Sequence, residues 1–147
     1  MRRYALVLLT VTLWVATLVL VVTVRAHAQA APQTQSRGWT IPATGAAEKS
    51  PLTVTDTVVA AGKKLFTAKC EHCHGPKGKG DGPDADPANQ DDMDLTVAAR
   101  AARNTDGTVF YKIWNGRSSP KMPAFSEQLT KEQAWTIVAF VQTLRAK

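Results

Sequence analysis

The stretch CEHCHGPKGKGDGP, from Cys70 to Pro83, holds both cysteines of the chain and two of its three histidines. Within it, Cys70, Cys73 and His74 form C-x-x-C-H, the attachment pattern of c-type haem. Two thiols about one helical turn apart can reach the two vinyl groups on one edge of a porphyrin, and the next residue can place its imidazole under the iron. The pattern therefore predicts one covalently attached haem c, with Cys70 and Cys73 as thioether links and His74 as an axial ligand.

Three other interpretations of the two cysteines fit the sequence less well. A zinc site needs four ligands, and beyond Cys70, Cys73 and His74 only His72 and His27 remain, neither of them well placed. A thioredoxin-like dithiol is expected in a β-α-β context, which this sequence does not offer. A disulfide between Cys70 and Cys73 would close a very small loop and stabilise little. Haem remains the favoured interpretation.

The iron needs a second axial ligand, for which Met93, Met122 and Lys121 are the candidates. A methionine at an arbitrary position more often fills a core than binds a metal. Met122, however, lies in SSPKMPAF between Pro120 and Pro123, which stiffen the backbone and exclude a helix. Met93 lies in an aspartate-rich loop and ranks second, whereas Lys121 can replace Met122 at high pH. The sequence thus predicts Met122 as the second axial ligand.

The N-terminal segment has the parts of an export signal. Arg2 and Arg3 precede an uncharged apolar run over residues 4–24, and RAHAQA then offers small residues at A-x-A spacing. The run exceeds an ordinary h-region of about 7 to 15 residues, and about 20 apolar residues can span a bilayer. We expect residues 1–30 to be a signal peptide or an uncleaved membrane anchor, which would tether the protein. Either places the remainder in the periplasm or on the outer face of the cytoplasmic membrane.

Charge is segregated along the exported part of the chain. The full chain has a net charge of +6, but three basic residues lie before residue 31, which leaves 15 basic and 12 acidic residues. This mild excess does not indicate a nucleic-acid partner. The aspartates lack EF-hand spacing, so a solvated acidic loop is expected rather than a calcium site. The aspartates of this loop are Asp81, Asp84, Asp86, Asp91, Asp92 and Asp94, and the lysines that bracket the cysteines are Lys63, Lys64, Lys69, Lys77 and Lys79.

Residues 31–54 have the composition of a flexible linker, rich in Ala, Pro, Ser, Thr and Gln. Trp39 and Ile41 are the exceptions, and we expect part of this segment to lie against the following domain. That domain covers residues 55–147. A loop is expected after Pro83 up to about residue 93, and a helical turn or two over residues 96–103.

Apolar residues at helical spacing predict three main helices in this domain. The first ends at Cys70, after a start at residue 55 or 56. The second lies in NTDGTVFYKIWNG, with Asp106 as its cap. The third lies in LTKEQAWTIVAFVQTLRAK, with a capping box of Thr130 and Gln133. No run alternates with period two, so the domain is expected to be all-α, and so small a core is usually stabilised by an additional element such as a large cofactor.

With these motifs the chain resembles the monohaem class I cytochromes c of bacterial periplasms and membranes over about residues 55–147. GKKLF is similar to the family's first helix, whose glycine and aromatic residue cross the last helix. The resemblance implies that Gly62 and Phe66 meet Ile137 and Phe140. The matching motifs continue in the family's order with DLT, DGTVFYKIWNG, and MPAF followed by LTKEQAWTIVAFV.

The resemblance also implies the fold and one further contact of the haem ligand. It implies a small class I cytochrome c fold, in which three main helices and long loops wrap around one haem. In the bacterial form of the haem loop, a proline carbonyl accepts a hydrogen bond from the proximal imidazole. Pro83 is the expected match in this chain, and Pro76 is the runner-up.

The expected function is one-electron transfer without catalysis, because His74 and Met122 together would fill both axial positions of the iron. The expected partners are a redox protein donor and acceptor in a respiratory or dehydrogenase chain, and the lysines near the cysteines would steer an acidic partner. One alternative is a haem-binding subunit of a larger oxidoreductase complex. A less favoured alternative is a peroxidase or gas sensor in which Met122 is labile.

Overall fold

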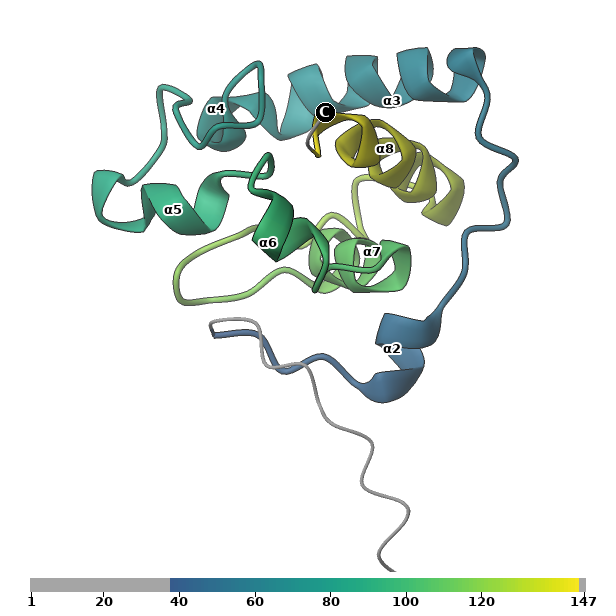
Figure 1. The fold of residues 1–147 in the computed structure, drawn as a ribbon, viewed down its shortest axis with the longest axis horizontal. Coiled ribbons are helices and arrows are strands. Elements are labelled where there is room, and N and C mark those ends of the chain that lie inside the picture. Colours follow the sequence, from purple (N-terminus) through teal and green to yellow (C-terminus); the bar gives the residue numbers. More distant parts are fainter. Residues whose placement is uncertain (1–37, 146–147) are drawn as a thin grey trace, which may run out of the picture. The chain divides into compact units, whose positions relative to one another are not determined.

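The structure, a computed structural model, describes residues 38–145 (Figure 1). The expected signal peptide or membrane anchor over residues 1–30 lies outside the described residues, as does the beginning of the expected linker. Between residues 38 and 145, no helix is both long and apolar enough to cross a membrane.

The described residues form helices joined by loops, which confirms the all-α class. Apart from isolated β-bridges, residues 38–145 contain no strand. Three of the helices are long enough to build a core, and the others are single turns that shape the loops between them. In chain order the elements are α2 (Ala43–Ala47), α3 (Asp56–Lys69), α4 (Glu71–His74), η1 (Pro87–Asn89), α5 (Gln90–Met93), α6 (Ala98–Ala101), α7 (Asp106–Asn115) and α8 (Lys131–Leu144).

Threonine side chains begin the three long helices by accepting hydrogen bonds from otherwise unpaired backbone N–H groups. Thr55 caps α3, and Thr130 caps α8 in the expected capping box with Gln133. Asp106 is not the cap of α7, as the sequence had suggested; Thr105 is, and it accepts from the backbone N–H of Thr108. Asp106 instead occupies the first helical turn, where its charge favours the positive end of the helix dipole.

Helices α3 and α8 cross in contact, and this crossing forms the centre of the core. Gly62 allows the close approach: a Cβ there would clash with the Thr136 carbonyl and lie 2.9 Å from the Phe140 Cβ. Phe66 is 1% exposed, and its ring centroid lies 5.2 Å from that of Phe140. The crossing of a glycine and an aromatic residue over the last helix is thereby confirmed.

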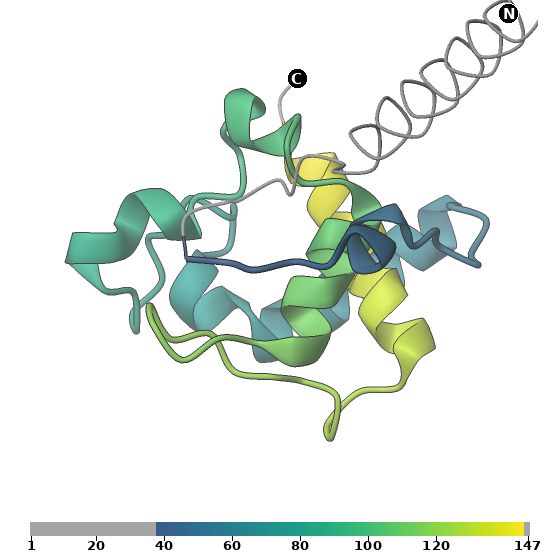
Figure 2. The ribbon, with the colours of Figure 1, turned by 90° about the horizontal axis from the view of Figure 1, so that it is seen from below.

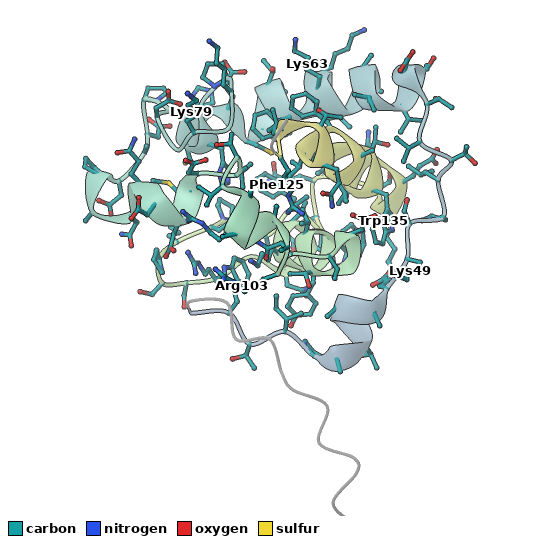
Figure 3. All side chains as sticks on the ribbon, in the orientation of Figure 1. Lys49, Lys63, Lys79, Arg103, Phe125 and Trp135 are labelled. Carbon is teal, nitrogen blue, oxygen red and sulfur yellow. The ribbon has the colours of Figure 1, made fainter. Side chains whose placement is uncertain are left out.

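Helix α7 packs on the same core through stacked aromatic rings. The Phe110 ring lies 4.2 Å from the Trp135 ring of α8, with an interplanar angle of 10°. Figure 3 labels Trp135 on α8, where it lies among the side chains between the helices. The loop after α7 returns to this core through Phe125, whose backbone N–H donates to the Ile113 carbonyl at 3.0 Å.

Part of the expected flexible linker, residues 39–47, is folded against the domain. Trp39 and Ile41 are 9% and 4% exposed, and α2 contacts α7. The Thr105 hydroxyl donates to the Ala46 carbonyl at 2.7 Å, and Gly107 leaves room for the α2 backbone to approach. Both views show α2 beside α7 (Figures 1 and 2). Only the expectation that Trp39 and Ile41 lie against the domain is confirmed for this segment.

Candidate functional site

The two cysteines and His74 lie on one helical turn. Cys70 ends α3 and precedes α4, which carries Cys73 and His74. Both cysteines are partly buried and are not joined by a disulfide. Burial, and then the neighbouring Cys73, raises the pKa of the Cys70 thiol to about 12. Two thiols three residues apart on one turn match the spacing that thioether links to a porphyrin require.

The loop after α4 folds back over this turn and fixes it. Gly75 ends α4 with φ +73°, a left-handed conformation that glycine adopts without strain. The backbone N–H of Gly80 then donates to the His74 carbonyl at 2.9 Å, and that of Asp84 donates to the His72 carbonyl at 2.8 Å. The glycine-rich composition of this stretch therefore serves close backbone packing around the turn that carries His74.

The His74 imidazole is oriented by the backbone of Met93. Its Nδ1 lies 2.7 Å from the Met93 carbonyl oxygen, to which a protonated Nδ1 donates. Burial lowers the pKa of His74, and the hydrogen bond to Met93 opposes this shift. A neutral imidazole whose Nδ1–H is engaged presents the lone pair of Nε2, which is the form that binds a metal. The site therefore holds His74 in the state that ligation requires.

The acceptor of the His74 hydrogen bond is thus Met93, and neither Pro83 nor Pro76 as expected. The segment after α5 runs beside the glycine-rich loop: the Leu95 N–H donates to the Gly78 carbonyl at 2.6 Å. This pairing brings the Met93 carbonyl to the imidazole. Pro83 is exposed and lies in the part of the loop that packs on the backbone of His72. The sequence offered no signal for Met93, because a backbone carbonyl leaves no side-chain pattern.

The position of Met93 also bears on the second axial ligand. Its backbone lies on the Nδ1 side of the His74 ring, whereas an iron bound to His74 would lie on the Nε2 side. This placement counts against Met93 as the ligand opposite His74. It also corrects the expectation of a simple loop in this region, since η1 and α5 precede the Met93 carbonyl.

Met122 lies in a tight loop that returns to the core. The loop leaves α7 at Gly116, which has φ +60°. Two backbone hydrogen bonds of 2.8 and 2.9 Å then join Arg117 to Met122. Met122 is partly buried and packs against the hydrophobic core that Cys70 also contacts, while the neighbouring Lys121 is exposed. The structure thus places the thioether of Met122, and not the ammonium of Lys121, toward the core.

A cluster of partly buried cations lies next to the Met122 loop. Burial, followed by the positive charges of Arg117, Arg145 and Arg100, lowers the pKa of Lys112 to about 8, against the opposing charge of Asp92. The Lys112 ammonium donates to the Asn104 side chain at 2.7 Å. The cluster has four basic side chains, and two carboxylates act on it, those of Asp92 and Asp106, so an excess of positive charge remains.

Arg117 of this cluster forms an ion pair with Asp92 that the sequence does not indicate. Arg117 Nη2 lies 3.8 Å from Asp92 Oδ2, and their side chains are only 12% and 15% exposed. The Trp39 ring covers the cations: its centroid is 4.8 Å from the Arg117 guanidinium carbon and 5.3 Å from the Lys112 ammonium. Asp92 had been expected in a solvated loop. A tryptophan in an otherwise polar segment was the only sequence signal for this arrangement.

Exposed lysines surround the turn that carries the cysteines. Lys63 on α3 and Lys79 on the loop after α4 are labelled in Figure 3. All five lysines near the motif are exposed, as are four of the aspartates in the acidic loop: Asp81, Asp84, Asp86 and Asp91. In the part of the chain that the structure describes, no three His, Cys, Asp or Glu side chains group as a metal site of their own.

Comparisons with known proteins gave a family match and a similar solved structure. A family model described as cytochrome c matches residues 59–145. A search of curated proteins gave no match. Among solved structures, the chain is similar to one in the Kuenenia stuttgartiensis reducing HAO-like protein complex Kustc0457/Kustc0458, with a TM-score of 0.56 and 26% identity. That match covers 66% of this chain and 48% of the other, so this chain corresponds to about half of its neighbour's length.

Proposed function

Because the chain belongs to the cytochrome c family and binds one haem c covalently, we propose that it transfers single electrons through an iron held by His74 and Met122. Haem-based electron transfer follows from the family, and the axial pair is the specific part of the proposal. The hydrogen bond between His74 Nδ1 and the Met93 carbonyl carries it, because this contact leaves Nε2 for the iron.

Different residues of the chain would hold different parts of the haem. Cys70 and Cys73 would hold the porphyrin edge, and the buried positive charge around Arg117 and Lys112 would receive its propionates. Haem c supplies an iron that cycles between the ferrous and ferric states. Met122, seated against the core by its loop, favours the ferrous state more than a second histidine would. Filled axial positions would exclude water and substrates, which suits a carrier without catalysis of its own.

We infer redox proteins as donor and acceptor. The exposed lysines around the cysteines would attract a partner with an acidic surface, so the association rate should fall as salt rises. The composition of residues 1–30 supports export, and hence a place in the periplasm or on the outer face of the cytoplasmic membrane, in a respiratory or dehydrogenase chain.

A second candidate is a haem subunit fixed within a larger oxidoreductase. The similarity to a chain of a reducing HAO-like protein complex favours it. Size-exclusion chromatography of the protein from its native membrane and soluble fractions separates the two: a subunit elutes with a large complex, and a carrier elutes alone.

The axial pair is tested on protein made in a host competent for haem attachment. Its mass should exceed that of the polypeptide by one haem. The ferric protein should show the far-red charge-transfer band between methionine sulfur and iron. Met122→Ala should abolish this band and leave the haem attached, whereas Met93→Ala should retain it. Retention of the band in Met122→Ala would overturn the assignment, and immediate binding of carbon monoxide by the wild-type ferrous protein would favour a gas-binding function.

A further inference from the structure

Arg117 contacts both segments on which the proposed axial ligands depend. Its backbone exchanges two hydrogen bonds with Met122, at 2.8 and 2.9 Å. Its side chain forms the ion pair with Asp92 at 3.8 Å. Asp92 immediately precedes Met93, whose carbonyl lies 2.7 Å from His74 Nδ1. A short series of contacts therefore joins Met122 to His74 along the chain's own side chains and backbone.

The ion pair lies in an environment that is largely withdrawn from solvent. Both side chains are largely buried, and the Trp39 ring covers the guanidinium at 4.8 Å. Charges withdrawn from water attract each other more strongly and are screened less by salt than charges on the surface. Asp91 precedes Asp92 on the same helix α5 but is exposed, so the two aspartates differ in burial and in partner.

We propose that Arg117 and Asp92 form a latch that holds the Met122 loop, residues 116–122, against the segment that orients His74. The latch keeps the Met122 thioether on the iron by opposing the outward movement of this loop. Arg117 and Asp92 are positioning residues, because they act on the iron through Met122 and Met93. This inference rests on the proposed axial pair.

Within residues 38–145, the backbone hydrogen bonds of the Met122 loop do not connect it to the segment that orients His74. The two hydrogen bonds between Arg117 and Met122 lie within the loop and move with it. Beyond the loop, the Phe125 N–H is fixed to α7 through the Ile113 carbonyl. The ion pair with Asp92 links the loop to the His74 side of the site. Its loss should raise the frequency with which Met122 leaves the iron.

The test measures that frequency on the ferric holoprotein. Imidazole can bind the iron only after Met122 has left, so the limiting rate of imidazole binding at saturating concentration reports the opening of the loop. Asp92→Asn removes the charge with almost no change in shape, and should raise the limiting rate about tenfold. Asp91→Asn removes an exposed charge one residue away and should leave the rate unchanged.

A double-mutant cycle identifies the pair as the cause. If Asp92 acts through Arg117, then Arg117→Gln and Asp92→Asn together should open the loop no faster than the more affected single variant. Arg117→Lys keeps a positive charge but loses the planar guanidinium, and should give an intermediate rate. Arg117→Gln carries the test if Asp92→Asn does not accumulate with haem.

The outcomes separate the latch from the axial assignment. A wild-type ferric protein without the methionine charge-transfer band overturns the axial pair and the latch together. A wild-type protein with the band, combined with equal limiting rates for Asp92→Asn and Asp91→Asn, overturns the latch alone. If Asp92→Asn is not obtained, an unchanged rate in Arg117→Gln has the same meaning. Additive effects in the cycle would show that the two residues act independently.

Discussion

Gly62 of α3 lies directly against α8, so that a Cβ at this position would lie 2.9 Å from the Phe140 Cβ and would clash with the Thr136 carbonyl. The carbonyl belongs to the helix backbone and cannot turn aside as a flexible side chain could. The separation of α3 and α8 is therefore set by the absence of a side chain at residue 62. This crossing also places Phe66 and, through α4, the turn that carries His74.

Gly62→Ala should destabilise the holoprotein by about 1–3 kcal/mol, the usual cost of overpacking a filled core. The helices must separate to admit the methyl group, which loosens the contact of Phe66 with Phe140. Guanidinium unfolding followed by the haem absorbance measures the loss. Ala61→Ser, on the exposed side of α3, is the matched control and should change the stability little. Equal stability of Gly62→Ala and wild type would contradict the close contact between α3 and α8 at Gly62.

Trp39→Ala should lower the unfolding free energy by about 3 kcal/mol, because it removes a buried aromatic side chain. The same variant uncovers Arg117 and Lys112, which Trp39 contacts through its ring. Val54→Ala is the control, since Val54 is 60% exposed in the same N-terminal segment. Thermal unfolding of both variants tests whether residues 38–54 belong to the folded domain. Unchanged stability in Trp39→Ala would restore the interpretation of this N-terminal segment as a flexible linker.

Asp94→Ala should raise the reduction potential, on the order of tens of millivolts, through the hydrogen bond of His74. The Asp94 carboxylate accepts from the Thr96 N–H at 2.8 Å and from its hydroxyl at 2.7 Å, which fixes the turn directly after Met93. A looser turn weakens the contact of the Met93 carbonyl with Nδ1, and the imidazole then donates less charge to the iron. Asp94→Asn keeps an acceptor oxygen and should stay near the wild-type potential. Equal potentials for the alanine and asparagine variants would argue against this route.

Lys112 should make the reduction potential depend on pH. Burial and the nearby arginines lower its pKa to about 8, and any propionate beside it would move the pKa upward. Protonated Lys112 disfavours the more positive ferric haem, so the potential should fall as pH rises through its pKa. The change should be on the order of tens of millivolts. Spectroelectrochemistry from pH 7 to about pH 10 should show this fall in wild type and in Lys64→Gln, but not in Lys112→Gln. The same slope in all three proteins would exclude Lys112 as the titrating group.

The parts of the fold that the sequence predicted are those with local signals. Helices α3, α7 and α8 follow from apolar spacing, and the capping box of Thr130 and Gln133 from neighbouring residues. The C-x-x-C-H turn is likewise local, as each member lies within five residues. Such patterns do not depend on where the rest of the chain goes.

The parts that the sequence missed depend on contacts between distant segments. The Met93 carbonyl reaches His74 only because residues 93–95 pair with the glycine-rich loop. Asp92 is partly buried beside Arg117, which comes from the loop after α7, whereas Asp91 is exposed. Composition alone assigned residues 38–54 to a linker, although two large apolar side chains in it find a place on the domain.

Because Trp39 packs against the domain, fewer residues are left to connect an N-terminal anchor to the haem domain. A free segment over residues 31–54 could have extended to about 80 Å, whereas residues 31–37 can extend to about 25 Å at most. If the apolar run were retained in the membrane, the haem domain would be confined to a thin layer at the bilayer surface. The domain could then reach membrane proteins whose redox centres lie close to the membrane plane. A soluble partner would have to diffuse to the membrane surface to meet it.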